Sequence, residues 1–207
     1  MKSVLISIQP KWVEKIASGQ KTIEVRKTAP KCEIPFKCYI YVTKEKKQDD
    51  IIWAGVFGDR GKWNGRVIGE FICDNVIEFE SGFHDDNTTE ELRRVWYDED
   101  DGERDAELFA EDGDPNYLCT AACLTWYELK NYVGTGYHTF YGLHISDLKI
   151  YDKPKELSEF KRPLDMPTCG YTECGSYETP YCKWLNMGCE KRIITRPPQS
   201  WCYVEEL

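Results

Sequence analysis

Three charged side chains lie close together near the start of the chain. Lys21, Glu24 and Arg26 place two cations and one carboxylate within six residues. Lys and Arg bind phosphate, Arg in a bidentate geometry, and a carboxylate can accept a hydrogen bond from an exocyclic amine such as cytosine N4. These residue types predict a site for a nucleotide. A plain surface pair of Glu24 with Arg26 on one strand face is the structural alternative, because such pairs are ubiquitous.

Aromatic and basic neighbours extend this candidate site. Aromatic rings can stack on an unpaired base if they reach the ligand, although Trp12 could instead fill the core. Lys21 and Glu24 are also the candidate catalytic groups, since a carboxylate beside a lysine can act as a general base when its pKa is raised. The predicted nucleic-acid-binding residues are Lys21, Glu24, Arg26, Lys27, Trp12 and Tyr39.

Local patterns predict the elements that position these residues. Residues 4–8 form an apolar, β-branched run that predicts a strand. A helix is expected from Pro10, which suits a first helical turn, and Gly19 is expected to cap its end. Residues 21–27 alternate between apolar and polar types. This period of two predicts a half-buried strand with one polar face that carries Glu24 and Arg26.

The rest of the chain predicts further strands and short helices. Thr125 and Glu128 form a capping box for a helix that ends near Gly134. A short helix is expected through Glu90–Trp96, and the charged residues 98–114 are expected to form a solvated loop. Strands mixed with a few helices indicate the α+β class. Strands are expected at residues 36–43, 66–79 and 141–151.

Charge is distributed unevenly along the chain. The net charge is −9, which argues against a protein that coats DNA or RNA generally. Residues 1–48 hold eleven Lys and Arg against four Glu, a net of +7, whereas residues 78–115 hold sixteen acidic residues against three Arg, a net of −13. A polyanion would bind the first segment and avoid the second. The acidic insert, about 80–117, could instead dock a basic protein partner.

The C-terminal segment is rich in cysteine. Its thiols follow the spacing C-x4-C-x7-C-x6-C, and four thiolates can hold a structural zinc ion tetrahedrally. Reduced core thiols and, in an exported protein, disulfides are the alternatives. We expect a domain boundary near residue 160, with a Cys-rich extension over 161–207, and zinc as the one candidate cofactor. The candidate zinc ligands are Cys169, Cys174, Cys182 and Cys189.

Apolar runs in the sequence are short. None approaches the roughly 20 residues that span a bilayer. The first residues lack the long apolar stretch and the cleavage site of a signal peptide. The sequence therefore predicts a cytoplasmic protein with no membrane partner.

Residues 19–26, GQKTIEVR, resemble the G-x-K-x-x-E-x-R motif of the ASCH domain family, a branch of the PUA-like superfamily. The apolar strand and the P-x-W helix that precede the motif are also similar. So are the later segments VIGEF, LTWYEL and HISDLKIYDKPKEL, which look like ASCH proteins of bacterial and prophage genomes. The resemblance covers roughly residues 3–160 and implies a small PUA-like β-barrel with flanking helices and a cleft beside the motif.

The resemblance also implies a class of ligand. ASCH proteins bind RNA or nucleotides, and some small members remove the acetyl group from N4-acetylcytidine. Those enzymes use a lysine, a threonine and a glutamate. Lys21 matches the lysine, but Glu24 stands at the threonine position and Ala122 at the glutamate position, so this activity is not carried over.

Three functions follow from these observations and stay open at this point. The first is binding of RNA or a modified nucleotide in a cleft lined by the motif. The second is a nucleoside amidohydrolase with altered catalytic residues, which leaves open whether the protein is an enzyme. The third is a phage-derived protein-interaction module that uses the acidic insert.

Overall fold

The chain divides into two compact units in a computed structural model. The structure describes residues 2–44, 63–83, 90–97, 104–111, 117–134, 136–163 and 193–207. Unit 1 consists of Met1–Ile8, Tyr39–Gly69 and Tyr151–Leu207. Unit 2 consists of Gln9–Cys38 and Glu70–Ile150.

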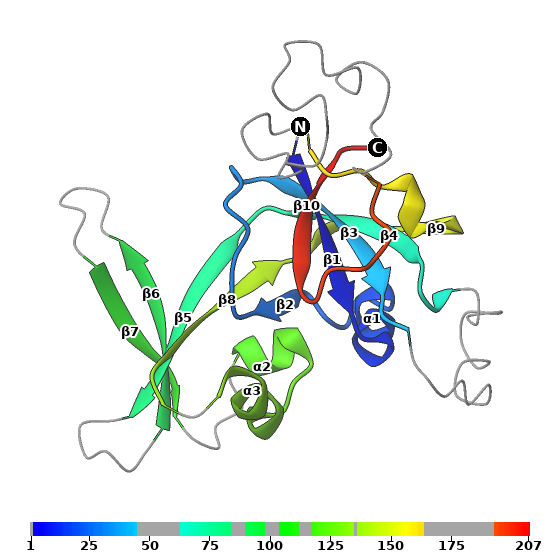
Figure 1. Cartoon of the computed structure of the whole chain (residues 1–207). Coiled ribbons are helices and arrows are strands. Elements are labelled where there is room, and N and C mark those ends of the chain that lie inside the picture. The colour runs from blue at the N-terminus through cyan, green and yellow to red at the C-terminus, as the bar shows by residue number, and fades with distance from the viewer. Residues whose placement is uncertain are drawn as a thin grey trace, which may run out of the picture. The chain divides into compact units, whose positions relative to one another are not determined.

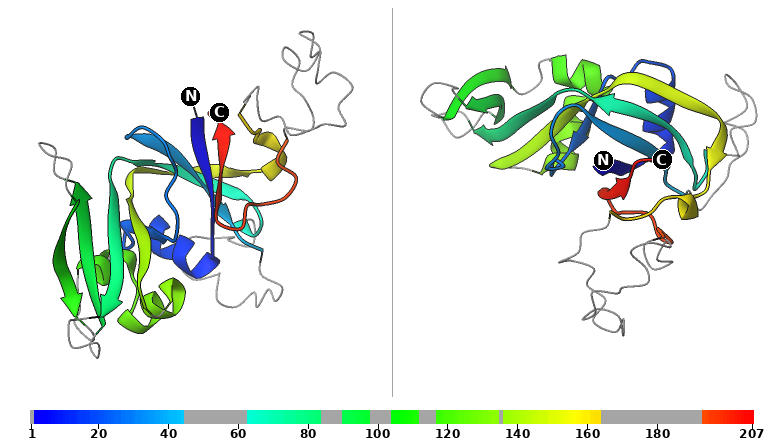
Figure 2. Two further views of the ribbon diagram at one scale, coloured as in Figure 1. Left: turned by 60° about the vertical axis from the view of Figure 1, so that its left-hand side comes forward. Right: turned by 90° about the horizontal axis from the view of Figure 1, so that it is seen from above.

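Two five-stranded sheets account for the described strands, and the first has the order β10-β1-β3-β4-β9. In unit 1, β1 pairs antiparallel with β10, with Lys2 opposite Glu205. The two ends of the described chain therefore run side by side, as both views show (Figure 2). The strands of this sheet are β1 (Lys2–Ile8), β3 (Phe36–Val42), β4 (Val67–Cys73), β9 (Ser146–Lys155) and β10 (Trp201–Glu205).

The core of unit 1 is apolar apart from two tyrosines. Tyr39 packs edge-to-face on Phe160, with ring centroids 5.0 Å apart. Its hydroxyl accepts a hydrogen bond from the backbone N–H of Leu207 at 2.8 Å. A short 3₁₀ helix, Leu157–Glu159, precedes Phe160. The buried members of this core are Leu5, Tyr39, Tyr41, Val67, Phe160, Ile194 and Val204.

The second sheet belongs to unit 2 and has the order β2-β8-β5-β6-β7. The three strands β5, β6 and β7 form a long antiparallel meander (Figure 1). β8 pairs antiparallel with β5 on one side and with the short edge strand β2 on the other. The strands are β2 (Ile23–Arg26), β5 (Val76–Phe83), β6 (Glu90–Tyr97), β7 (Arg104–Glu111) and β8 (His138–His144).

Two helices of unit 2 begin and end as their local sequence predicts. Helix α1 (Pro10–Ala17) starts with proline in its first turn, and Gly19 follows the C-cap at a φ of 72°, which glycine adopts freely. In α3 (Trp126–Val133), Thr125 and Glu128 form the predicted capping box. Both predictions are confirmed. The short helix α2 (Tyr117–Ala122) comes just before α3.

The core of unit 2 lies between the helices α2 and α3 and the strands β2, β5 and β8. Ile23 and Val25 contribute the apolar face of β2, and α2 and α3 contribute most of the remaining side chains. Phe79 and Phe140 stack with ring centroids 5.4 Å apart. The buried members are Ile23, Val25, Phe79, Leu118, Cys119, Ala121, Ala122, Leu129, Val133 and Phe140.

The acidic insert differs from its prediction. The expected helix through Glu90–Trp96 is wrong, because these residues form β6. The expected loop over 98–114 is also wrong in part, because Arg104–Glu111 forms β7. Charged residues are compatible with such a strand, because an antiparallel strand in a hairpin does not have to be buried on both faces. The register places Arg94 opposite Glu107, a pairing that is invisible to local pattern reading.

The α+β class is confirmed. The pairing of the described strands does not close either sheet into a barrel. The segments 66–79 and 141–151, each expected as one strand, are divided, because β4 ends at Cys73 and β8 ends at His144. The domain boundary near residue 160 stays a prediction, since residues 164–192 lie outside the described part. In the described part of the chain, no helix has the length and apolarity to cross a membrane.

Candidate nucleic-acid site

Strand β2 buries charged residues on its second face. Ile23 and Val25 lie in the unit 2 core, and the alternating period turns Glu24 and Arg26 the other way. Lys21, Glu24 and Arg26 are nevertheless only 3%, 5% and 7% exposed. The prediction of a half-buried strand is therefore wrong, because the polar face of β2 is buried as well. We call these three residues the charge cluster.

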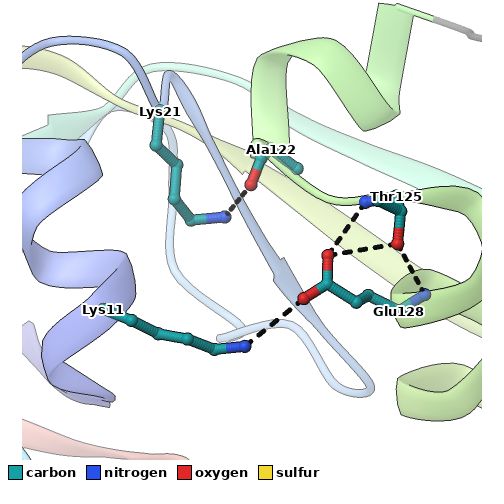
Figure 3. A network of polar contacts seen from close by, with 5 residues as sticks. All are labelled: Lys11, Lys21, Ala122, Thr125 and Glu128. Atoms are coloured by element: carbon teal, nitrogen blue, oxygen red, sulfur yellow. Dashed lines mark hydrogen bonds and ion pairs between the residues drawn. The ribbon is translucent and has the colours of Figure 1, made fainter.

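Ion pairs hold the charge cluster together. Arg26 Nη2 lies 2.8 Å from Glu24 Oε1, and Lys21 Nζ lies 3.3 Å from Glu24 Oε2. Lys21 Nζ also donates a hydrogen bond to the carbonyl oxygen of Ala122 at 2.8 Å (Figure 3). That carbonyl ends α2, where the partial negative charge of the helix favours a cation. Glu24 is thus held between two cations.

One carboxylate oxygen of Glu24 is not hydrogen-bonded by the described residues. Its Oε2 accepts no hydrogen bond from the described residues, although it lies within ion-pair distance of Lys21 Nζ. Buried polar atoms are nearly always hydrogen-bonded, so each exception requires an explanation. Burying three charges also costs desolvation energy that their mutual attraction often fails to offset. Stability alone therefore does not account for the cluster.

Backbone hydrogen bonds fix the segment that leads into β2. The N–H of Thr22 donates to the carbonyl of Ala121 at 2.8 Å, and the N–H of Lys21 donates to Lys15 at 2.9 Å. The thiol of Cys123 donates to the carbonyl of Gln20 at 3.3 Å. These contacts attach the motif to α1 and to the end of α2, so the direction of the Lys21 side chain is set by backbone geometry.

Two aromatic side chains lie beside the charge cluster. The half-buried Trp12 has Lys11 Nζ 4.1 Å and Lys21 Nζ 5.5 Å from its ring centroid. On α3, Tyr132 is 39% exposed, and the side chain of Arg26 and the backbone of Lys27 lie near its hydroxyl. Burial of the hydroxyl raises the pKa of Tyr132 above its ordinary value, and the nearby Arg26 opposes this.

An ion pair joins α1 to α3. Lys11 Nζ donates to Glu128 Oε1 at 3.4 Å, while Glu128 Oε2 accepts from the backbone N–H of Thr125 at 3.0 Å (Figure 3). The hydrogen bond from Thr125 lowers the pKa of Glu128, and Lys11 adds to that effect. The capping box therefore also places an exposed lysine beside the site.

The structure brings most of the predicted binding residues together. Lys21, Glu24, Arg26, Lys27 and Trp12 lie in one contact network in unit 2. Local sequence patterns did not indicate Tyr132, Lys11 or the Ala122 carbonyl, because each contacts the motif from a segment distant in sequence or along a helix face.

Tyr39 is the exception among the predicted binding residues. It belongs to the core of unit 1 and its exposed fraction is 0%, so its ring has no surface on which a base could stack. The strand predicted at residues 36–43 is present as β3, and it is buried on both faces.

The predicted zinc ligands cannot be placed. Cys169, Cys174, Cys182 and Cys189 lie outside the described residues. Within the described ranges, no three His, Cys, Asp or Glu side chains form a group that could hold a metal ion.

Buried thiols of unit 2 lie near the charge cluster but suit packing. Burial raises the pKa of Cys38 well above its ordinary value and that of Cys73 to about 12. Thiols with such pKa values are poor nucleophiles near neutral pH, because the thiolate is the reactive form.

A separate pocket lies in unit 1. It has a volume of about 630 Å³. None of the predicted site residues lines it. Its lining residues are Tyr41, Thr43, Lys44, Gly65, Glu156, Leu157, Ser158, Ile194, Thr195 and Pro197.

The chain is structurally similar to ASCH proteins. The crystal structure of ASCH from Zymomonas mobilis is 16% identical, with a TM-score of 0.48 over 99% of this chain and 88% of that chain. A mutant form of the same protein is 15% identical, with a TM-score of 0.48 over 99% and 89% of the two chains. No family model and no curated protein matches the sequence.

Proposed function

We propose that the charge cluster and Trp12 bind a base of RNA or of a modified nucleotide. The observation that carries this proposal is the buried Oε2 of Glu24, which accepts no hydrogen bond from the described residues. A base with an exocyclic amine would supply the missing donor, as cytosine N4 does for carboxylates. The resemblance of residues 19–26 to the ASCH motif supports the same class of ligand.

The geometry changes the roles expected for the two cations of the cluster. Lys21 and Arg26 are buried and paired with Glu24, so they suit orienting its carboxylate better than holding an exposed phosphate. The exposed Lys11 and Lys27 are the better phosphate ligands. Trp12 supplies the stacking surface, since its ring lies beside Lys21 and is partly exposed.

Fluorescence anisotropy with a labelled, mixed-sequence single-stranded RNA hexamer tests this function. Lys21→Met is compared with Lys149→Met, which removes the same charge from an exposed position on β9. We expect salt-dependent binding that Lys21→Met weakens by at least about tenfold, equal to about 1.4 kcal/mol. We expect Lys149→Met to bind like the parent. Equal binding by parent and Lys21→Met would remove the proposal.

A nucleoside amidohydrolase is the alternative that the close contact of Lys21 with Glu24 allows. Because Glu24 is held between two cations, its carboxylate suits accepting a hydrogen bond better than acting as a base. Incubation with N4-acetylcytidine and detection of released acetate tests the alternative. Turnover that is lost in Glu24→Gln would favour the enzyme over the binding protein.

A further inference from the structure

Two lysine–aromatic pairs flank the charge cluster. On one side, Lys11 Nζ lies 4.1 Å from the ring centroid of Trp12. On the other side, Lys27 Nζ lies 5.6 Å from the ring centroid of Tyr132. Both lysines are exposed. Each pair combines an aromatic face, which can stack on a base, with a cation that can contact a phosphate.

The two pairs are connected through the cluster itself. Lys21 lies 5.5 Å from the Trp12 ring and pairs with Glu24. Glu24 pairs with Arg26, whose side chain lies near the hydroxyl of Tyr132. Trp12 and Tyr132 are therefore the two ends of one continuous row of contacts, with Glu24 in the middle of the row.

We propose that the ligand is a short single-stranded polynucleotide of at least two nucleotides, and that Tyr132 is the stacking residue for the second base. This inference rests on the proposed function. One base is bound at Glu24 beside Trp12, the neighbouring base stacks on Tyr132, and Lys27 contacts the phosphate near that second base. A mononucleotide carries one base and cannot occupy both aromatic rings.

The single-stranded form follows from the same geometry. A base in a duplex already stacks on its neighbours and pairs through the edge that Glu24 would contact. Stacking on an aromatic side chain requires an unstacked base and tolerates any sequence, because every base has a π face. The ring of Tyr132, at 39% exposure, is accessible to such a base without rearrangement of the core.

Two substitutions separate the ring of Tyr132 from its hydroxyl. Tyr132→Phe keeps the stacking face and loses the hydroxyl near Arg26, whereas Tyr132→Leu removes the ring at a partly exposed helix position. We expect Tyr132→Leu to weaken binding of the RNA hexamer by about tenfold, the lower part of the range for loss of one stacked base. We expect Tyr132→Phe to keep most of the affinity.

The experiment measures parent and variants by anisotropy with the RNA hexamer and by calorimetry with cytidine 5′-monophosphate. The inference requires that Tyr132→Leu weakens the hexamer and leaves the mononucleotide unchanged, and that Lys27→Gln reduces the salt dependence of hexamer binding by about one phosphate contact. A DNA hexamer that binds equally well supports a single-stranded ligand of either sugar, and one that does not bind restricts it to RNA.

Three results would overturn the inference. They are hexamer binding that Tyr132→Leu leaves unchanged, a mononucleotide that binds as tightly as the hexamer, and duplex RNA that binds as tightly as the single strand. If Lys21→Met still weakens binding in any of these cases, the proposed function stands and only the two-base inference fails. If Lys21→Met also binds like the parent, the function itself fails.

Discussion

The two units differ in whether all of their buried polar side-chain atoms are hydrogen-bonded. In unit 1 the buried phenol of Tyr39 accepts a hydrogen bond from Leu207, and no buried side-chain nitrogen or oxygen among the described residues of this unit is left without a hydrogen bond. In unit 2 the strand β2 and the residues just before it bury three charges, and Glu24 Oε2 has no hydrogen bond from the described residues. Both units bury an apolar cluster, so the charges are not needed to make a core of this size.

This difference separates residues that stabilise the fold from residues whose burial stability does not explain. A buried ion cluster can often be replaced by apolar side chains without loss of stability. Ile23 and Val25 already supply the apolar face of β2 that packs in the core. The charge cluster on the opposite face is therefore the part of unit 2 that we assign to ligand binding.

The largest expected effect comes from Glu24→Ala. It leaves Lys21 and Arg26 buried at short range without the carboxylate that both contact. Removing one partner of a buried ion pair lowers the free energy of unfolding by about 3–5 kcal/mol. Urea denaturation followed by circular dichroism measures it. A loss below about 1 kcal/mol, the value of an exposed pair, would mean that solvent reaches the cluster.

Replacing the whole cluster sharpens the comparison. The triple variant Lys21→Met, Glu24→Leu, Arg26→Met removes all three charges and keeps similar side-chain volume. We expect its free energy of unfolding to equal that of the parent or exceed it by about 1–4 kcal/mol. The same urea titration checks this. A triple variant less stable than Glu24→Ala would show that the charges hold β2 in place.

A smaller effect is expected from Tyr39→Phe in unit 1. The substitution removes the acceptor of the Leu207 N–H and keeps the edge-to-face contact with Phe160. We expect the free energy of unfolding to fall by about 1 kcal/mol. RNA binding should not change, because Tyr39 is fully buried in the unit 1 core. Weaker RNA binding by this variant, if it is still folded, would contradict the assignment of RNA binding to unit 2 alone.

The smallest effect concerns Glu128 and depends on pH. Its pKa is lowered in the folded protein, mainly by the hydrogen bond from Thr125. A lowered carboxyl pKa contributes stability above the unfolded value of about 4.3, and this is lost as pH falls through the folded-state pKa. Because the side chain is 40% exposed, we expect Glu128→Gln to cost only about 0.5 kcal/mol at pH 7.

Thermal unfolding at pH 7 and at pH 3 measures this contribution. The parent and Glu128→Gln should differ at the higher pH, and the difference should shrink as the pH falls through the lowered folded-state pKa of Glu128. A difference that does not shrink between pH 7 and pH 3 would assign the loss to the geometry of the cap instead of to the charge on Glu128.

Local patterns predicted part of this structure well. Alternation placed Glu24 and Arg26 on one face of β2, and the capping box located the start of α3. These features depend on residues close in sequence. Alternation distinguishes two faces but does not say whether the polar face is solvated, which is why the burial of the charge cluster was not predicted.

The features that were missed depend on contacts distant in sequence. Tyr132 reaches Arg26 from α3, and the Ala122 carbonyl reaches Lys21 from the end of α2. β6 became a strand because β5 and β7 pair with it. Tyr39 was predicted to bind nucleic acid, whereas its strand, β3, is covered on both sides. In each case the partner, not the local sequence, decides the outcome.

RNA binding by the triple variant tests the central claim most directly. The variant is first shown to be folded by its circular dichroism spectrum and urea midpoint, and it is then titrated into the labelled RNA hexamer at low salt beside the parent and Lys149→Met. The account predicts that the triple variant is stable and fails to bind, while the parent and Lys149→Met bind alike. A folded triple variant that binds the hexamer as tightly as the parent would contradict the assignment of the charge cluster to ligand binding.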